Sequence, residues 1–204
     1  MSAANRFPGM LSRRAVSIGV GLVLLRLASE ARSEEAGTPA PTDRFDYLRT
    51  HGNSNCSGAF MASIATMPAV ARLQGSCCSP MDRHRYIEQV QGLTKYSVIS
   101  EIPPNPYDVV AGLAQTLMLS YDLALPPDEQ RAYQYAMDNS EEQGPCCCRC
   151  WRWKVYGGLA KYLIRERRFT GEMVVEVWDL SDGCGGGNEH HHGWLQEGVV
   201  RPAP

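Results

Sequence analysis

The sequence predicts an all-α protein: one domain of five or six helices that follows a signal peptide and a linker. Start signals for helices, in which Ser, Asn or Pro precedes Pro and an acidic residue, recur along the chain. Apolar residues after these signals recur at helical spacing, and no apolar–polar alternation is longer than about five residues. A length of 204 residues is enough for one domain with its own hydrophobic core.

The amino-terminal segment, residues 1–31, has the pattern of an export signal. Residues 12–14 (SRR) contain paired arginines, residues 15–25 are apolar, and residues 29–31 (SEA) form a small-x-small cleavage site. An apolar run of about eleven residues is too short to span a membrane and suits a signal peptide. The pattern resembles a twin-arginine translocation signal. We therefore expect a periplasmic or extracellular protein without a membrane span after cleavage; a plain secretory signal and an uncleaved anchor are the alternatives.

Three further segments follow the signal peptide. Residues 32–44 are rich in Pro, Ala and Thr, which is typical of a flexible linker. Residues 45–187 contain the helix signals and all eight cysteines, and they form the expected helical domain, in which 45–58 is interpreted as a loop. Residues 188–204 are expected to be a flexible tail that carries three consecutive histidines. The net charge is −2, so the sequence lacks the excess of basic residues that is typical of nucleic-acid-binding proteins.

The first three helices are expected between residues 59 and 121. An apolar run predicts a helix at 59–73, broken or kinked where Pro68 removes a backbone donor. The second helix starts with Ser79 as N-cap and Pro80 at the first helical position, and it runs to about residue 96. Residues 105–108 (NPYD) repeat that start signal, and apolar residues at helical spacing follow.

The last three helices are expected after residue 125. Residues 126–129 (PPDE) place proline and two acids at a helix start. The Gly-Pro pair at 144–145 predicts a long helix from 146 to 168. The final helix begins near Thr170 and ends at the glycine-rich stretch 183–187.

Eight cysteines dominate the chemistry of the sequence, and four of them lie within five residues. Thiolates are soft ligands that select Cu(I), Zn²⁺ or an iron–sulfur cluster, the last being the weakest candidate here. If a helix opens at Pro145, two of these sulfurs at i and i+4 converge on one ion at about 2.3 Å, and the helix dipole favours the thiolate. The sequence therefore predicts a soft-metal site formed by Cys146, Cys147, Cys148, Cys150 and Cys184. A possible second site comprises Cys56, Cys77 and Cys78, with His51 as a candidate to complete it.

Two other interpretations stay open. An even number of cysteines permits four disulfides, so the chain can be a disulfide-stapled exported domain that interacts with an exported partner. Bridges between adjacent cysteines are strained, which counts against this interpretation within the main cluster. A thiol redox protein is the third possibility, because a cysteine such as Cys147 or Cys148 at a helix start has a lowered pKa. The sequence has no hydrolytic or phosphate-binding motif, which favours a binding protein over an enzyme.

Three segments together resemble a known family. Residues 145–150 (PCCCRC), followed by 177–179 (VWD) and 183–184 (GC), are similar to the bacterial PCYCGC-motif proteins. The resemblance runs from Gln130 to Gly187. The family comprises exported or lipid-anchored proteins of unknown function, so the resemblance implies a cysteine-based site in an exported helical domain.

The chain departs from the family's pattern at three points. Cys147 stands where the family has Tyr, and Arg149 stands where it has Gly. Only one late cysteine, Cys184, is present where the family tends to have more. The resemblance brings no particular activity to this chain.

Overall fold

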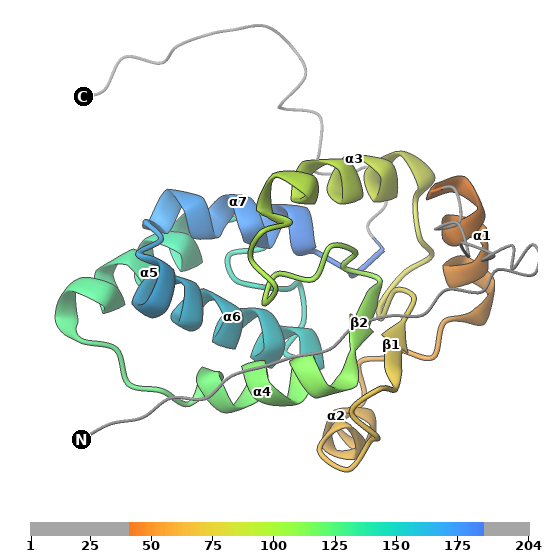
Figure 1. The fold of residues 1–204 in the computed structure, drawn as a ribbon, viewed down its shortest axis with the longest axis horizontal. Helices are drawn as coiled ribbons and strands as arrows, with labels where there is room; N and C mark the ends of the chain where they lie inside the picture. Colours follow the sequence, from red (N-terminus) through yellow and green to blue (C-terminus); the bar gives the residue numbers. More distant parts are fainter. Residues whose placement is uncertain (1–40, 186–204) are drawn as a thin grey trace, which may run out of the picture. The chain divides into compact units, whose positions relative to one another are not determined.

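The computed structural model describes residues 41–185, and Figure 1 shows their arrangement. This part of the chain is mostly helical, as the sequence predicts, but it has seven α-helices where five or six are expected, and it also contains a small two-stranded sheet that the all-α expectation lacks. In chain order the elements are α1 (Pro41–His51), α2 (Gly58–Ile64), β1 (Arg72–Gln74), α3 (Arg83–Leu93), a 3₁₀-helix (Thr94–Tyr96), β2 (Asp108–Val110), α4 (Ala111–Tyr121), α5 (Pro127–Asn139), α6 (Trp151–Arg167) and α7 (Gly171–Ser181).

Several predicted segments lie outside the described residues. They are the signal peptide at 1–31, most of the linker at 32–44, and the histidine-containing tail at 188–204. The last linker residues, 41–44, form the start of α1. Between residues 41 and 185, no helix combines the length and the apolar character that crossing a membrane requires.

Helix α6 lies at the centre of the main hydrophobic core, and α4, α5 and α7 all pack against it. Side chains that recur at helical spacing along α6, including Trp151, Val155, Leu159 and Leu163, are completely buried. A helix that is apolar on most of its surface is expected at such a central position. The core therefore fixes α6 firmly, and with it the loop that precedes α6.

A glycine brings α4 and α6 unusually close together. A Cβ atom on Gly158 would lie 1.8 Å from the backbone oxygen of Leu117 in α4, so only glycine fits at this crossing. Helix α7 is joined to α6 by a hydrogen bond in which Trp178 Nε1 donates to the backbone oxygen of Tyr156 at 2.9 Å.

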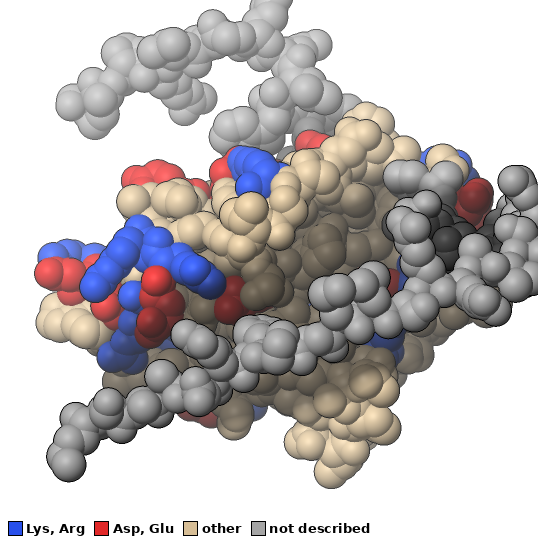
Figure 2. All heavy atoms as spheres, viewed as in Figure 1, with Lys and Arg blue, Asp and Glu red and all other residues tan. Residues whose placement is uncertain are grey.

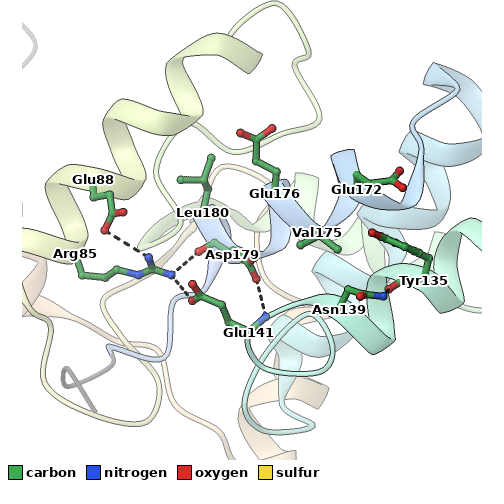
Figure 3. A pocket seen from close by; sticks show the side chains of 10 residues that line it. All are labelled: Arg85, Glu88, Tyr135, Asn139, Glu141, Glu172, Val175, Glu176, Asp179 and Leu180. Carbon is green, nitrogen blue, oxygen red and sulfur yellow. Dashed lines mark hydrogen bonds and ion pairs between the residues drawn. The ribbon is translucent and has the colours of Figure 1, made fainter. Parts of the chain in front are cut away.

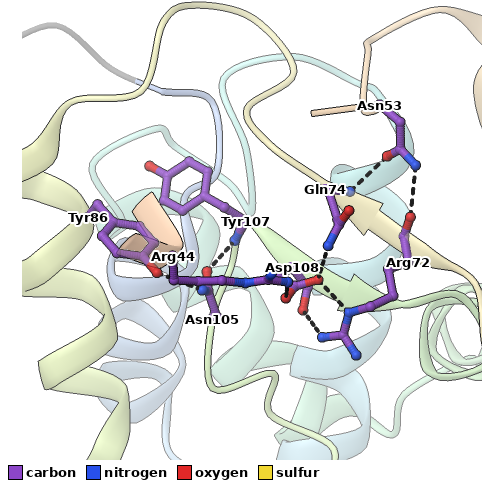
Figure 4. Close-up of polar contacts among 8 residues, drawn as sticks. All are labelled: Arg44, Asn53, Arg72, Gln74, Tyr86, Asn105, Tyr107 and Asp108. Atoms are coloured by element: carbon purple, nitrogen blue, oxygen red, sulfur yellow. Dashed lines mark hydrogen bonds and ion pairs between the residues drawn. The ribbon is translucent and has the colours of Figure 1, made fainter. Parts of the chain in front are cut away.

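The two strands form an antiparallel pair in which buried Leu73 lies opposite buried Val109. The helix expected after residues 105–108 is present, but its predicted start is wrong, because Asp108 belongs to β2 and the helix starts only at Ala111. Figure 4 shows the reason: the buried carboxylate of Asp108 binds the guanidinium groups of Arg44 and Arg72. These tertiary partners join α1 to the sheet and override the local helix signal.

Other boundaries also differ from the predictions. The cap of α3 is Asp82, whose Oδ1 accepts a hydrogen bond from Arg85 N at 2.8 Å, and not Ser79. Helix α2 ends at Ile64, because the chain turns there towards β1. The predicted starts at the 126–127 proline pair and at Thr170 are confirmed, since α5 begins at Pro127 and Thr170 caps α7.

The predicted loop at 45–58 is wrong in its first half, which is part of α1. Phe45 and Leu48, three positions apart on α1, are buried in a second small core. The ring of Phe45 lies 5.4 Å from that of Tyr86 in α3. Packing against α3 thus stabilises a helix whose own sequence has a weak helical signal.

Charged side chains of both signs lie next to one another on the face drawn in Figure 2. They gather near the ends of α5 and α6, where Asp128 pairs with Arg131 and Glu129 pairs with Arg168. Exposed pairs of this kind each contribute less than about 1 kcal/mol to stability. Opposite charges therefore compensate one another locally at this end of the domain.

Candidate metal centre

All eight cysteines come together in one cluster, which we call the thiol cluster. They reach it from four connecting segments: before α2, between β1 and α3, between α5 and α6, and after α7. Each sulfur lies within 4.0 Å of at least two others, and none of them forms a disulfide. The main and second sites expected from the sequence are thus a single site, formed by Cys56, Cys77, Cys78, Cys146, Cys147, Cys148, Cys150 and Cys184.

Six of the sulfurs form a closed ring. The Sγ–Sγ separations around the ring are 3.7 Å (Cys77–Cys78), 3.6 Å (Cys78–Cys147), 2.7 Å (Cys147–Cys184), 3.0 Å (Cys184–Cys146), 3.8 Å (Cys146–Cys150) and 4.0 Å (Cys150–Cys77). Cys56 and Cys148 add a triangle to the ring at Cys78. Its sides measure 3.1 Å (Cys56–Cys78), 3.4 Å (Cys56–Cys148) and 3.4 Å (Cys78–Cys148).

Cys148 occupies the centre of the thiol cluster. Three sets of four sulfurs, each with all members within 4.8 Å of one another, can hold a metal ion. They are Cys56, Cys77, Cys148 and Cys150; Cys77, Cys78, Cys148 and Cys184; and Cys146, Cys147, Cys148 and Cys184. Because Cys148 belongs to every set and the sets together contain all eight residues, its sulfur is within 4.8 Å of each of the other seven.

The sulfur spacing suits tetrahedral thiolate coordination. Ligands at a Zn–S distance of about 2.3 Å lie about 3.8 Å from one another in a tetrahedron. Most of the neighbouring pairs, at 3.4–4.0 Å, are close to that value. The shorter pairs that Cys184 makes, at 2.7 and 3.0 Å, have to open by about 1 Å or less to admit an ion between them.

The thiol cluster has a buried side and an exposed side. Cys146, Cys150 and Cys184 are buried, whereas Cys78 and Cys147 are exposed to solvent. The exposed sulfurs give an ion direct access from the solvent. The buried sulfurs provide a water-poor environment in which a metal–thiolate bond is protected.

Backbone hydrogen bonds hold two of the cysteine segments side by side. Ser79 N donates to the Cys184 oxygen at 2.9 Å, and Cys77 N donates to the Gly183 oxygen at 3.4 Å. A Cβ atom on Gly183 would lie 2.1 Å from a guanidinium nitrogen of Arg152, so glycine is required where the chain passes this side chain. These contacts place Cys184 against residues that are more than 100 positions earlier in the sequence.

The long helix expected from 146 to 168 is present as α6, but its predicted start is wrong, because the cysteine segment is a loop and α6 starts only at Trp151. Cys150 is the N-cap, and its sulfur accepts a hydrogen bond from Arg152 N at 3.4 Å. The positive end of the α6 dipole therefore still favours a thiolate at this position. Cys146 and Cys150 are close, as expected, but because the loop folds back and not because they share a helix face.

Arg152 places a buried positive charge beside the thiol cluster. Its guanidinium donates to the backbone oxygens of Gly75, at 2.9 Å, and Pro106. Within residues 41–185 no carboxylate lies within ion-pair distance of Arg152, although its side chain is fully buried. Burial opposes the charge, but the neighbouring acidic groups of Tyr156, Cys77, Cys146 and Cys184 outweigh burial and raise the pKa of Arg152.

The thiols hold most of their protons when no ion is bound. Burial raises the pKa of the Cys56 thiol to about 12, and burial likewise raises the pKa of Cys78. Hydrogen bonds from Cys146, Cys150 and Cys184 lower the pKa of Cys77, which makes it the favoured thiolate. A group of eight thiolates would repel one another, so further protons leave only when a cation takes their place.

Sequence reasoning missed Arg152 as part of the site, and it considered Gly183 only as a helix end and as part of the Gly-Cys motif. The one available signal was the position of Arg152 between two tryptophans directly after the cysteines. His51, a candidate for the second site, belongs to none of the three sulfur sets. Its ring instead stacks on Tyr47 at 4.6 Å, and Nδ1 is 2.8 Å from Thr50 Oγ1.

A separate cleft of about 560 Å³ lies among α3, α5 and α7 (Figure 3). Arg85 reaches into it and binds Glu88, Glu141 and the backbone oxygen of Asp179. Asp179 Oδ1 accepts a hydrogen bond from Glu141 N at 3.0 Å. The cleft is therefore acidic, apart from Arg85, and it is lined by different residues from those of the thiol cluster.

No known protein family, curated protein or solved structure matches the chain.

Proposed function

We propose that this is an exported, cysteine-rich protein that binds a soft metal ion, Cu(I) or Zn²⁺, through the thiol cluster. The observation that carries the proposal is that every sulfur has at least two sulfur neighbours within 4.0 Å. Covalent pairing needs one neighbour for each sulfur, whereas a shared cation draws several thiolates together. The absence of any oxygen or nitrogen ligand from the three candidate sets favours a soft ion over Ca²⁺ or Mg²⁺.

The export part of the proposal rests on residues 1–31 alone. The paired arginines at 13 and 14, the short apolar run and the cleavage pattern support the twin-arginine route. Replacement of both arginines by lysine should keep the protein in the cytoplasm of its native host. Unchanged export of that double variant would favour a plain secretory signal.

A disulfide-stapled domain is the second candidate, and the short separation between Cys147 and Cys184 favours it. A sulfur can form only one disulfide, however, and Cys184 is also only 3.0 Å from Cys146. Pairing Cys184 with either residue leaves the other without its closest partner. The arrangement around Cys184 is therefore easier to explain by a shared ion.

Metal content and thiol content together separate the two candidates. The protein is purified anaerobically with a reductant, incubated with Cu(I) or Zn²⁺, desalted, and analysed for metal by elemental analysis. We expect at least one ion per chain and free thiols after denaturation with a chelator. A second preparation is isolated without reductant, and its free thiols are counted. If the reduced protein binds no stoichiometric metal and the second preparation has no free thiols, the proposal is overturned and the stapled domain is supported.

A further inference from the structure

The three candidate sets of sulfurs overlap in a way that limits how ions can fill them. Every set contains Cys148, so no two sets are disjoint. Two ions with four sulfurs each therefore cannot occupy separate sites in the thiol cluster. If each ion takes four sulfurs, either one ion binds and leaves four thiols unused, or the sulfur of Cys148 is shared between ions.

The coordination habit of the metal decides between these possibilities. Zn²⁺ takes four ligands in structural sites, so the overlapping sets would accept a single Zn²⁺ ion. Cu(I) is the softer ion and is held by about two or three thiolates, so it uses fewer sulfurs per ion and tolerates bridging ones. The triangle of Cys56, Cys78 and Cys148 already offers a three-sulfur set next to the six-membered ring.

The buried charge of Arg152 fits an anionic cluster. Several Cu(I) ions bound to a larger number of thiolates leave a net negative charge. Arg152 is fully buried without a carboxylate partner among the described residues, and α6 holds its guanidinium beside the thiol cluster. Negative charge beside a buried guanidinium offsets the cost of removing that guanidinium from water.

We infer that the thiol cluster binds more than one Cu(I) ion, with the thiolate of Cys148 bridging between ions. The inference rests on the proposed function and deepens it. Each cysteine that binds copper loses its one S–H proton to the solvent, the thiolate of Cys148 uses a second lone pair for the bond to a second ion, and copper remains Cu(I) throughout. Cys148 is thus a ligand on which several ions depend, whereas Cys147 belongs to a single set.

The matched variants Cys148→Ser and Cys147→Ser test this inference, because the same chemical change is made at adjacent positions. Each protein is titrated anaerobically with Cu(I) supplied from a chromogenic chelator, and bound copper per chain is measured at saturation. The wild type should bind more than one ion, and Cys147→Ser should retain more than one. Cys148→Ser should lose at least about twofold more bound copper than Cys147→Ser does.

The outcomes separate the inference from the proposed function. Saturation of the wild type at one ion, or equal losses in the two variants, would overturn the bridging role and leave metal binding intact. No bound ion in the wild type would overturn both. If Cys148→Ser does not fold, X-ray absorption on the copper-loaded wild type tests the bridging instead. Copper–copper scattering beyond the first shell of sulfur ligands supports bridging, and its absence contradicts bridging.

Discussion

Two residues determine the character of the site at the residue scale. Cys148 lies within 4.8 Å of all seven other cysteine sulfurs, so its sulfur is available to any ion that the thiol cluster binds. Arg152 supplies a fixed positive charge on the buried side, where carbonyl oxygens of two different segments orient it. Besides the hydrogen bond from Cys146, the charge of Arg152 lowers the pKa of Cys77 and so favours a thiolate at a place where eight like charges would otherwise repel one another.

Replacement of Arg152 tests this arrangement. Arg152→Met should lower the free energy of unfolding of the reduced, metal-free protein by about 3 kcal/mol or more, because two buried carbonyls lose their donors. Arg152→Lys lacks the planar fork that reaches both carbonyls, but it keeps the charge. Its free energy of unfolding should therefore fall by less than that of Arg152→Met. Urea unfolding under reducing conditions measures both. Equal stability of the Met variant and the wild type would show that Arg152 has no structural part in the site.

A second residue-scale prediction concerns pH. Burial, with Glu141 and Asp182 nearby, raises the pKa of Asp179 from 3.8 to about 6, against the opposing effects of the Glu141 amide and Arg85. The folded state therefore holds this proton more tightly than the unfolded state, and the stability that the proton contributes is lost as pH rises through about 6. Asp179→Asn preserves an oxygen acceptor for Glu141 N and does not titrate. Its stability relative to wild type should rise between about pH 4 and pH 6.5, as measured by urea unfolding at each pH; a constant difference would contradict the raised pKa.

At the element scale, the position of the cysteine loop depends on how closely α6 packs against its neighbours. Gly158→Ala should lower the free energy of unfolding by about 2–3 kcal/mol, because the new methyl group overlaps the Leu117 carbonyl of α4. This loss opposes the gain of about 1 kcal/mol that alanine brings to an ordinary helix interior. Gly58→Ala at the start of α2 is the control, since a Cβ there meets no atom within 4 Å. Similar effects of the two substitutions would contradict the close packing of α4 and α6.

The elements differ in how far the sequence alone predicts them. The starts of α5 and α7 were predictable, because Pro127 and Thr170 act through their own backbone and nearest neighbours. The strand at Asp108 was not, because its carboxylate is bound by Arg44 and Arg72 from distant segments. Local signals predict an element correctly when no buried tertiary partner competes for the same residues.

The same distinction explains the candidate site. The cysteines themselves were recognisable from residue type and spacing, including the late Cys184. The union of two expected sites into one was not predictable, because it depends on the contacts of residues 77–79 with 183–184 and on the buried Arg152. Such contacts between distant segments have no short-range signature in a single sequence.

At the scale of the whole molecule, metal binding and folding should be coupled. The sulfurs come from positions between 56 and 184, so the thiol cluster exists only when almost the entire described domain is folded. An ion that binds only the folded state adds about 2.7 kcal/mol of stability when its free concentration is about 100 times its dissociation constant. Because thiols must lose protons to bind, the stabilisation should weaken as pH falls.

This coupling is measurable as a shift in thermal unfolding. Under anaerobic, reducing conditions, a soft ion should raise the unfolding midpoint by several degrees, and a thiol-competitive chelator should reverse the shift. Mg²⁺ at the same concentration should have no effect, because it prefers oxygen ligands. A midpoint that is the same with and without Cu(I) or Zn²⁺ would show that the folded domain has no preference for these ions.

The most direct test of the central claim is the identity of the atoms around the bound metal. X-ray absorption on protein loaded anaerobically with Cu(I) or Zn²⁺ measures that coordination shell. We expect sulfur ligands only, at about 2.3 Å, because every member of the three candidate sets is a cysteine. A shell made of nitrogen or oxygen atoms would place the ion outside the thiol cluster and contradict the account.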